Sequence, residues 1–392
     1  MPPEISTFAQ SLGGSTVVAM RRKADALEAA GMEIVDFGIG EPDFDVPEPV
    51  KAAAIAAIQG GHGKYVDPAG LPQLRESICR FEKQCHGTDA PPENIVVTNG
   101  SYGALSMIMR AILNPGDEVL LIEPCWGPYR QMVRLCGAVP VGVPMPTVEG
   151  RFVLEKEPIA DALTTRTRAI IVNTPWNPTG RVLSREELTA VAAVAERHDL
   201  WIVADEVYSE LIYDGAEHVS VATISPETAA RSVIASSLSK SFAMTGWRLG
   251  YCIAPPDLAA VLTKINHTTT RCAPSIVQHA AVAAFEEGLP SVEAMRDEYA
   301  RRARAVARGL NQIEGVICPV PEGTFYALAQ IPEQWGGSAA VADDLLTKAG
   351  VIVTPGAAYG PSCEHYIRLS FATSMDIIEE GLTRLRRALP PS

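Results

Sequence analysis

The sequence has few features of a membrane-spanning, secreted or metal-dependent protein. No stretch approaches the roughly 20 apolar residues that cross a bilayer. The N-terminus lacks the basic start and apolar run of a secretory signal. The eight cysteines are scattered and form no C-x-x-C pair, which argues against a zinc site or a redox motif. We therefore expect a cytoplasmic protein with reduced thiols and no metal.

Positive charge is also scarce. The chain has 33 Lys and Arg against 46 Asp and Glu, a net charge of −13. Nucleic acids and anionic membranes require basic surface, so neither is expected as a partner. The 47% hydrophobic and 20% charged residues are ordinary for a globular enzyme, and 392 residues suffice for more than one domain.

The most informative stretch is residues 236–251, which follows a short apolar run expected to be a buried strand. Ser237, Ser239 and Lys240 lie at the exit of that strand, and Arg248 follows eight residues after the lysine. Hydroxyls and a guanidinium suit a phosphate, and a lysine can form a Schiff base with an aldehyde. One ligand carrying both groups is pyridoxal 5'-phosphate. The alternative, an ordinary surface stretch, stays open at this point.

Apolar strands alternate with helices through the middle of the chain. This rhythm is typical of a mostly parallel sheet covered on both faces, and ligands on such sheets bind at the carboxyl ends of the strands. The expected strands lie in residues 94–98, 118–124, 169–175, 200–206 and 233–237. The candidate functional residues follow these strands: Gly100, Trp126, Asn177, Asp205 and Lys240.

The two ends of the chain have a different pattern. After about residue 282, a long charged helix near 291–312 precedes short strands near 323–329, 351–353 and 366–371. This arrangement indicates a separate α+β lobe, which the N-terminal residues are expected to join. The predicted division is an N-terminal segment 1–47, a large domain 48–282 and a small domain 283–392.

Several ordered motifs cover nearly the whole chain. They are G-E-P-D-F (40–44), Y-V-D-P-A-G-L-P-Q-L-R (65–75), N-P-G-D-E-V (114–119), N-P-T-G (177–180), D-E-V-Y (205–208), the stretch 237–251 and Y-I-R-L-S-F-A (366–372). Together they resemble the class I/II aminotransferases, which are fold-type I pyridoxal-phosphate enzymes. The subgroup most similar contains bacterial aspartate, aromatic and kynurenine aminotransferases.

The resemblance implies an α/β fold whose large domain has a mostly parallel seven-stranded sheet, with a smaller α+β domain built from both termini. It implies a cytoplasmic homodimer that moves an amino group between an α-amino acid and a 2-oxo acid by a ping-pong mechanism. Another reaction on the same cofactor, such as β-elimination, decarboxylation or oxidation, remains an alternative. A ligand-sensing regulator domain is a further alternative, but no DNA-binding segment is visible.

The resemblance also assigns roles around the cofactor ring. Lys240 would form the Schiff base and then move a proton between the substrate Cα and the cofactor. Asp205 would pair with the ring nitrogen, so that the ring accepts electrons. Tyr208 and Asn177 would bind the ring hydroxyl oxygen, and Trp126 would stack on the ring face.

The cofactor phosphate would be held by residues from two strand ends. The implied ligands are the backbone N–H groups of Ser101 and Tyr102, with Ser237, Ser239 and Arg248. Free backbone N–H groups at a helix start favour phosphate.

Substrate and partner contacts complete the implied site. Arg368 would bind the substrate α-carboxylate with a bidentate pair, supported by Asn177 and the backbone near Gly40. Tyr65 would reach the phosphate of the neighbouring subunit. Arg271 lies in a segment that borders the substrate pocket in relatives, so it would either bind an acidic side chain or pair with a surface carboxylate.

Overall fold

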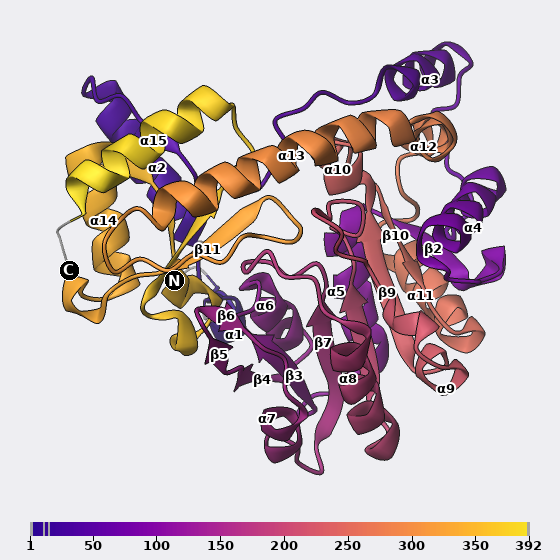
Figure 1. The fold of residues 1–392 in the computed structure, drawn as a ribbon. Helices are drawn as coiled ribbons and strands as arrows, with labels where there is room; N and C mark the ends of the chain where they lie inside the picture. The colour runs from indigo at the N-terminus through magenta and orange to yellow at the C-terminus, as the bar shows by residue number, and fades with distance from the viewer. Residues whose placement is uncertain (1–2, 11, 15, 390–392) are drawn as a thin grey trace.

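The computed structural model describes residues 3–10, 12–14 and 16–389. A seven-stranded sheet with helices on both faces forms the larger part, and a smaller part surrounds a three-stranded sheet (Figure 1). Helix α13 (Leu289–Leu310) runs across the top of the view from the larger part to the smaller one. The site described below lies where the two parts meet.

The seven-stranded sheet has the order β2-β10-β9-β8-β7-β3-β4. Only β10 runs antiparallel to its neighbours, which confirms the mostly parallel sheet expected from the sequence. The strands are β2 (Ile95–Thr98), β3 (Glu118–Glu123), β4 (Val139–Pro144), β7 (Thr167–Asn173), β8 (Trp201–Asp205), β9 (Ser232–Ser237) and β10 (Gly250–Ile253).

Two hydrophobic clusters cover the two faces of this sheet. Side chains alternate along a strand, so Ile170 belongs to one cluster and Ile171 to the other. Full burial of each such side chain contributes about 1.5–3 kcal/mol, which explains the continuous apolar runs in the sequence. The covering helices are α3 (Glu48–Gln59), α4 (Pro72–His86), α5 (Gly100–Ile112), α6 (Pro128–Leu135), α7 (Lys156–Asp161), α8 (Arg185–Arg197), α9 (Pro226–Ala229), α10 (Leu238–Ser241), α11 (Pro256–Thr269) and α12 (Ser275–Glu287).

The smaller part combines segments from both ends of the chain. In its antiparallel sheet, β14 lies between β11 and β13. Strand β1 pairs in parallel with β12, so an N-terminal strand joins the C-terminal part; the three-range division stays a prediction that this pairing supports. The elements are α1 (Thr7–Gln10), α2 (Thr16–Ala29), β1 (Val35–Asp36), β11 (Tyr326–Gln330), α14 (Ser338–Ala349), β12 (Val351–Ile352), β13 (Thr354–Pro355), β14 (Tyr366–Ser370) and α15 (Met375–Ala388), and a hairpin of β5 (Thr147–Val148) and β6 (Arg151–Phe152) lies apart from them in sequence.

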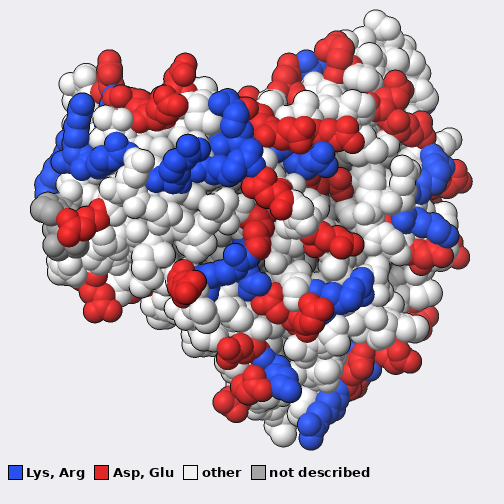
Figure 2. All heavy atoms as spheres, in the orientation of Figure 1, with Lys and Arg blue, Asp and Glu red and all other residues white. Residues whose placement is uncertain are grey.

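Charged side chains of both signs are interspersed on the face in Figure 2. Basic side chains of α13 pair with nearby acids: Arg301 with Glu298, and Arg304 with Asp214. Such pairing divides the surface charge into small neutral groups. Within the described residues, no helix is both long and apolar enough to cross a membrane.

Candidate active site

A cavity of about 610 Å³ opens at the carboxyl ends of the parallel strands. The structure brings nearly all the predicted site residues to its wall. They are Gly40, Ser101, Tyr102, Trp126, Asn177, Asp205, Tyr208, Ser239, Lys240, Arg248 and Arg368. Ser237 and Tyr65 do not line it. Residues 200 positions apart therefore meet in one space, as the strand-end rule predicts.

Lys240 lies at the exit of β9, on the short helix α10. Ser237 begins that helix, and its Oγ accepts a hydrogen bond of 3.3 Å from the backbone N–H of Ser239. Ser237 is thus buried below the cavity as a helix cap. The Lys240 Nζ donates to the Gly40 carbonyl. Burial lowers the pKa of Lys240, and the positive charges of Arg368 and Arg248 lower it further.

Asp205 ends β8 and is only 3% exposed. Tyr129 donates a hydrogen bond of 2.6 Å to its Oδ2, and the backbone N–H of Val207 donates one of 3.3 Å to its Oδ1. Burial raises the pKa of Asp205 to about 6, although these two hydrogen bonds oppose the shift. Tyr129 was not predicted from the sequence; the available signal was its place three residues after Trp126, at the start of α6, which follows β3.

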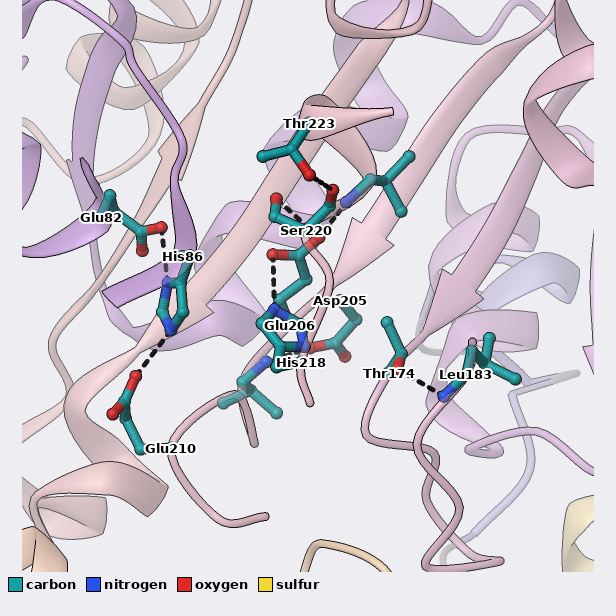
Figure 3. Close-up of polar contacts among 12 residues, drawn as sticks. Glu82, His86, Thr174, Leu183, Asp205, Glu206, Glu210, His218, Ser220 and Thr223 are labelled. Atoms are coloured by element: carbon teal, nitrogen blue, oxygen red, sulfur yellow. Dashed lines mark hydrogen bonds and ion pairs between the residues drawn. The ribbon is translucent and has the colours of Figure 1, made fainter. Parts of the chain in front are cut away.

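Asn177 is held beside Asp205 by a second asparagine. Asn173 Nδ2 donates to the Asp205 carbonyl at 2.8 Å, and Asn173 Oδ1 accepts from the Asn177 backbone N–H at 2.8 Å. Leu183 donates from its backbone to Thr174 Oγ1 at 3.1 Å, which fixes the base of the same turn (Figure 3). The buried Oδ1 of Asn177 has no hydrogen-bond partner among the described residues. Its amide is therefore free for a ligand.

Trp126 lies between two tyrosines at the cavity wall. The rings of Tyr102 and Tyr129 meet its indole edge-on, with centroids 5.0 Å and 5.3 Å away. Edge-to-face contacts hold aromatic rings in a fixed orientation. The indole is thus a half-buried wall of the cavity, fit to cover a planar ring.

Arg368 is almost fully buried and lines the same cavity as Lys240. Its Nη2 donates to the Gly38 carbonyl at 2.9 Å and to Thr354 Oγ1 at 3.2 Å. Its guanidinium lies 4.1 Å from the Tyr326 ring centroid, and its buried Nε has no partner among the described residues. No carboxylate of a described residue forms an ion pair with Arg368. A buried cation with a free donor is suited to a ligand carboxylate.

Tyr326 is a second residue that the sequence analysis missed. Tyr208 donates a hydrogen bond of 3.3 Å to its hydroxyl, and both side chains line the cavity. Tyr326 thus joins Tyr208 from the larger part to Arg368 in the smaller part. It starts an ordinary apolar strand, and nothing in that pattern distinguishes it from a core tyrosine.

Another end of the cavity is basic and rich in donors. Helix α5 begins at Gly100, so the N–H groups of Ser101 and Tyr102 lie in its first turn and have no helical partner. Gly100 has φ +71°, a conformation that favours glycine, and a Cβ there would lie 2.7 Å from Arg248 Nη2, so the helix start lies close to this guanidinium. Arg248 is exposed and its Nη1 donates to the Thr245 carbonyl at 2.8 Å.

The donor set fits pyridoxal phosphate. A helix start and an arginine suit the phosphate, and the buried acid Asp205 suits the ring nitrogen. The Asn177 carboxamide, whose Oδ1 is unpaired among the described residues, suits the ring hydroxyl. Lys240, whose pKa is lowered by burial, suits the aldehyde.

Tyr65 and Arg271 lie together outside this cavity. Tyr65 is 78% exposed, and the Arg271 guanidinium lies 5.4 Å from its ring centroid. The Arg271 side chain also forms a hydrogen bond with His267. No carboxylate among the described residues pairs with Arg271, so the surface ion pair considered for it in the sequence analysis is not seen within one chain.

A second space of about 340 Å³ adjoins the main cavity; we call it the annex. Tyr102, Trp126 and Arg368 line both spaces, and Tyr359 and Arg130 line the annex alone. Arg130 forms an ion pair with the buried Glu123. Because the annex adjoins Arg368, it is where the side chain of a ligand held by Arg368 has room.

Comparisons with known proteins agree with this geometry. A family model described as aminotransferase class I and II matches residues 32–385. An aspartate aminotransferase of Geobacillus stearothermophilus is 38% identical over 382 residues, 96% of each chain. A Thermus thermophilus aspartate aminotransferase structure with maleate has a TM-score of 0.93 and 37% identity, covering 99% of this chain and 100% of that one. An aromatic aminotransferase structure from Pyrococcus horikoshii has a TM-score of 0.88 and 37% identity, covering 93% and 97%.

Proposed function

The chain belongs to the class I and II aminotransferases and moves an amino group between an amino acid and a 2-oxo acid with pyridoxal phosphate, and from this premise we propose how its residues divide the work. The observation that carries the proposal is that one cavity joins Lys240, Asp205 and Arg368. Lys240 supplies a base, Asp205 an acidic group for the ring nitrogen, and Arg368 a cation that binds the substrate carboxylate.

Lys240 and Asp205 are the proposed proton-handling residues. When bound, the cofactor supplies an aldehyde for amines and a ring that accepts electrons from the substrate Cα. Lys240 Nζ takes the proton from the substrate Cα, and its lowered pKa makes it a usable base near neutral pH. Asp205 holds a proton at the ring nitrogen, and Tyr129 keeps its carboxylate in place.

The remaining cavity residues hold and orient the cofactor. Ser101, Tyr102 and Arg248 bind the phosphate, and Ser239 lies on the same wall. Ser237 acts through the α10 cap that fixes Lys240 and Ser239.

The ring has its own set of contacts. Asn177 and Tyr208 orient it through its hydroxyl oxygen, and Trp126 covers one face and excludes water from it.

Arg368 binds the substrate α-carboxylate through a bidentate pair. It is fixed by Gly38, Thr354 and Tyr326, so a bound carboxylate has a defined position relative to Lys240. Gly40 and Asn177 complete this end of the substrate site. The arrangement turns the substrate Cα toward the amine that takes its proton.

A homodimer with shared sites is part of the proposal. Tyr65 is highly exposed and is not among the residues that line the main cavity of its own chain. Helix α3, which precedes it, exposes Ile55 and Ile58 at 55% and 61%. Exposed apolar side chains of this kind favour a protein interface. Tyr65 then binds the phosphate of the partner's cofactor, and Arg271 enters the partner's site beside it. The cytoplasmic location stays a prediction.

We propose that the amino donor is acidic. Two relatives are named aspartate aminotransferases, and an acidic side chain in the annex needs a cation. Arg130 is already paired with Glu123, whereas Arg271 has no carboxylate partner among the described residues. Arg271 of the partner subunit is therefore the proposed ligand of the substrate side chain.

A half-reaction screen tests both parts of the proposal. The holoenzyme is mixed with aspartate, glutamate, phenylalanine or alanine without an oxo acid, and pyridoxamine phosphate is measured by absorbance and chromatography. We expect it to form fastest with the acidic donors. If no donor yields it, transamination by this site is contradicted.

Arg271→Ala tests the substrate preference separately. Removing one partner of a buried charge pair costs about 2–5 kcal/mol, so kcat/KM for aspartate should fall at least about tenfold, mainly through KM. Alanine, which has no side-chain charge, is the matched control and should change little. A preference for phenylalanine, or equal changes for aspartate and alanine, would contradict the acidic donor but not transamination.

A further inference from the structure

The turn that follows β8 carries two cavity residues and two anchors. Asp205 and Tyr208 face the cavity. Glu206 and Glu210, close by in sequence, contact His218 and His86 instead (Figure 3). The cofactor contacts and the anchors therefore alternate along one short segment.

The first anchor is a fully buried pair of Glu206 and His218. Both side chains are 2% exposed, and Glu206 Oε2 lies 3.2 Å from His218 Nε2. Glu206 Oε1 also accepts hydrogen bonds from Ser220 Oγ at 3.2 Å and from the Val221 backbone N–H at 3.0 Å. Three partners satisfy this carboxylate, which fixes the residue immediately after Asp205.

The second anchor is a histidine between two carboxylates. His86, the last residue of α4, contacts Glu210 Oε1 at 2.6 Å and Glu82 Oε2 at 2.9 Å. Tyr251 from β10 donates to the other oxygen of Glu82. Burial alone would lower the pKa of His86, but the two carboxylates outweigh it and raise the pKa to about 11. His86 is therefore a buried cation that ties Glu210 to α4.

The two anchors contact one another. The rings of His86 and His218 lie 5.1 Å apart at 81°. The turn is thus held on both sides of Tyr208 by one network, consisting of Glu82, His86, Glu206, Glu210 and His218, which we call the histidine anchor.

Energetic reasoning indicates what such a network does. Replacing a buried ion group by packed apolar residues is often neutral or stabilising, whereas removing one partner alone is destabilising. Ion groups of this kind are thus a poor means of gaining stability, but they fix geometry strictly. The geometry fixed here is that of Asp205 and Tyr208, because the anchored carboxylates are their neighbours in the turn.

We propose that Glu206, Glu210 and His86 are positioning residues, which act through the turn to hold Asp205 and Tyr208 against the cofactor ring. The proposal rests on the function proposed above for these two residues. It differs from a purely structural ion network in one respect. Loosening the anchor at the turn should weaken cofactor binding beyond what the accompanying loss of fold stability accounts for.

Glu210→Gln is the main test, because Glu210 is the most exposed member of its triad, at 14%, and glutamine keeps its shape. Tyr251→Phe is the matched control: it removes a hydrogen bond to the same network from β10, but does not touch the turn. Apoenzyme is titrated with pyridoxal phosphate to measure Kd, and urea unfolding of the apoenzyme measures stability. Glu206→Gln is a second variant should Glu210→Gln fail to fold.

We expect Glu210→Gln to weaken pyridoxal phosphate binding at least tenfold and to shift the pH midpoint of the bound cofactor's absorbance. Tyr251→Phe should lower the urea midpoint and leave Kd within about twofold of wild type. An unchanged Kd and spectrum in Glu210→Gln overturns the proposal. It is also overturned if both variants lose affinity in the same proportion to their lost stability. If the two variants differ in Kd as expected but the wild-type enzyme does not catalyse transamination, the result would count against the proposed function alone.

Discussion

Tyr129 donates a hydrogen bond of 2.6 Å to Asp205, although the two residues are 76 positions apart. The bond stabilises a carboxylate whose pKa is raised to about 6 by burial. Burial disfavours the ionised form of Asp205, and the hydrogen bond from Tyr129 stabilises that form and so limits the rise of the pKa.

Tyr129→Phe should destabilise the apoenzyme more at pH 7.5 than at pH 4.5. The pKa of Asp205 is about 6 in the folded protein and about 3.9 when unfolded, so ionisation of Asp205 already disfavours folding as pH rises through this range. Loss of the hydrogen bond raises the folded pKa further and enlarges the effect. Urea unfolding at both pH values measures it. Tyr102→Phe, in the same cavity, should show no such pH difference; an equal loss at both pH values in Tyr129→Phe would exclude the explanation.

Asp205→Asn should keep the fold but slow the half-reaction by about 10²-fold or more, because the amide cannot hold a proton at the ring nitrogen as a carboxylate does. Stopped-flow absorbance with an amino acid measures the rate, and circular dichroism checks the fold. A rate like that of wild type would remove Asp205 from the mechanism.

Borohydride reduction of the holoenzyme should attach the cofactor to Lys240, since its burial lowers its pKa and it lines the cavity. Peptide mapping identifies the labelled residue. Lys240→Ala should lose the label and nearly all turnover, whereas Lys64→Ala, beside the exposed Tyr65, should retain both. Label on any other lysine contradicts the assignment.

Tyr65→Phe should weaken cofactor retention while Lys240 remains reactive, because the two residues are expected to serve different subunits. Mixing a Tyr65 variant with a Lys240 variant should then restore some activity, since one site of a hybrid dimer is intact. Activity assays of the mixture, with each variant alone as control, measure this. A fully active monomer in sedimentation would disprove shared sites.

The stability contributed by His86 should fall as pH rises. Its folded pKa is about 11, above the unfolded value of about 6.5. The contribution is therefore complete below pH 6.5 and is lost progressively as pH rises toward 11. The urea midpoint of wild type should decrease between pH 6 and pH 10 relative to that of His86→Gln. Parallel curves for the two proteins would show that His86 is not the charged partner of Glu82 and Glu210.

Much of the fold follows from the sequence because burial has a simple pattern. The five apolar runs became β2, β3, β7, β8 and β9. A capping box of Ser184 and Glu187, a pattern readable from sequence, begins α8. Strand β4 escaped notice because two prolines and a glycine interrupt it, as an edge strand allows. Strand β10 was hidden within the motif around Arg248.

The site was less accessible from sequence where partners come from distant segments. Lys240, Asp205 and Asn177 could be found because each follows a strand. Tyr326 could not, because its contact with Tyr208 spans 118 positions and its own strand looks like ordinary core.

The histidine anchor was invisible for a related reason. His86 ends a helix and Glu210 lies in a turn. Periodicity tells which residues are buried, but not which buried charges meet.

The segment from Gly38 to Gly40 links the two cations of the site through one short stretch of backbone. Its two end carbonyls accept hydrogen bonds from Arg368 and Lys240, so the backbone competes with the ligands for both cations. An incoming carboxylate or aldehyde exchanges with a carbonyl instead of meeting a bare charge. Because both carbonyls belong to one three-residue segment, any shift of its backbone changes the hydrogen bonds of Arg368 and Lys240 together.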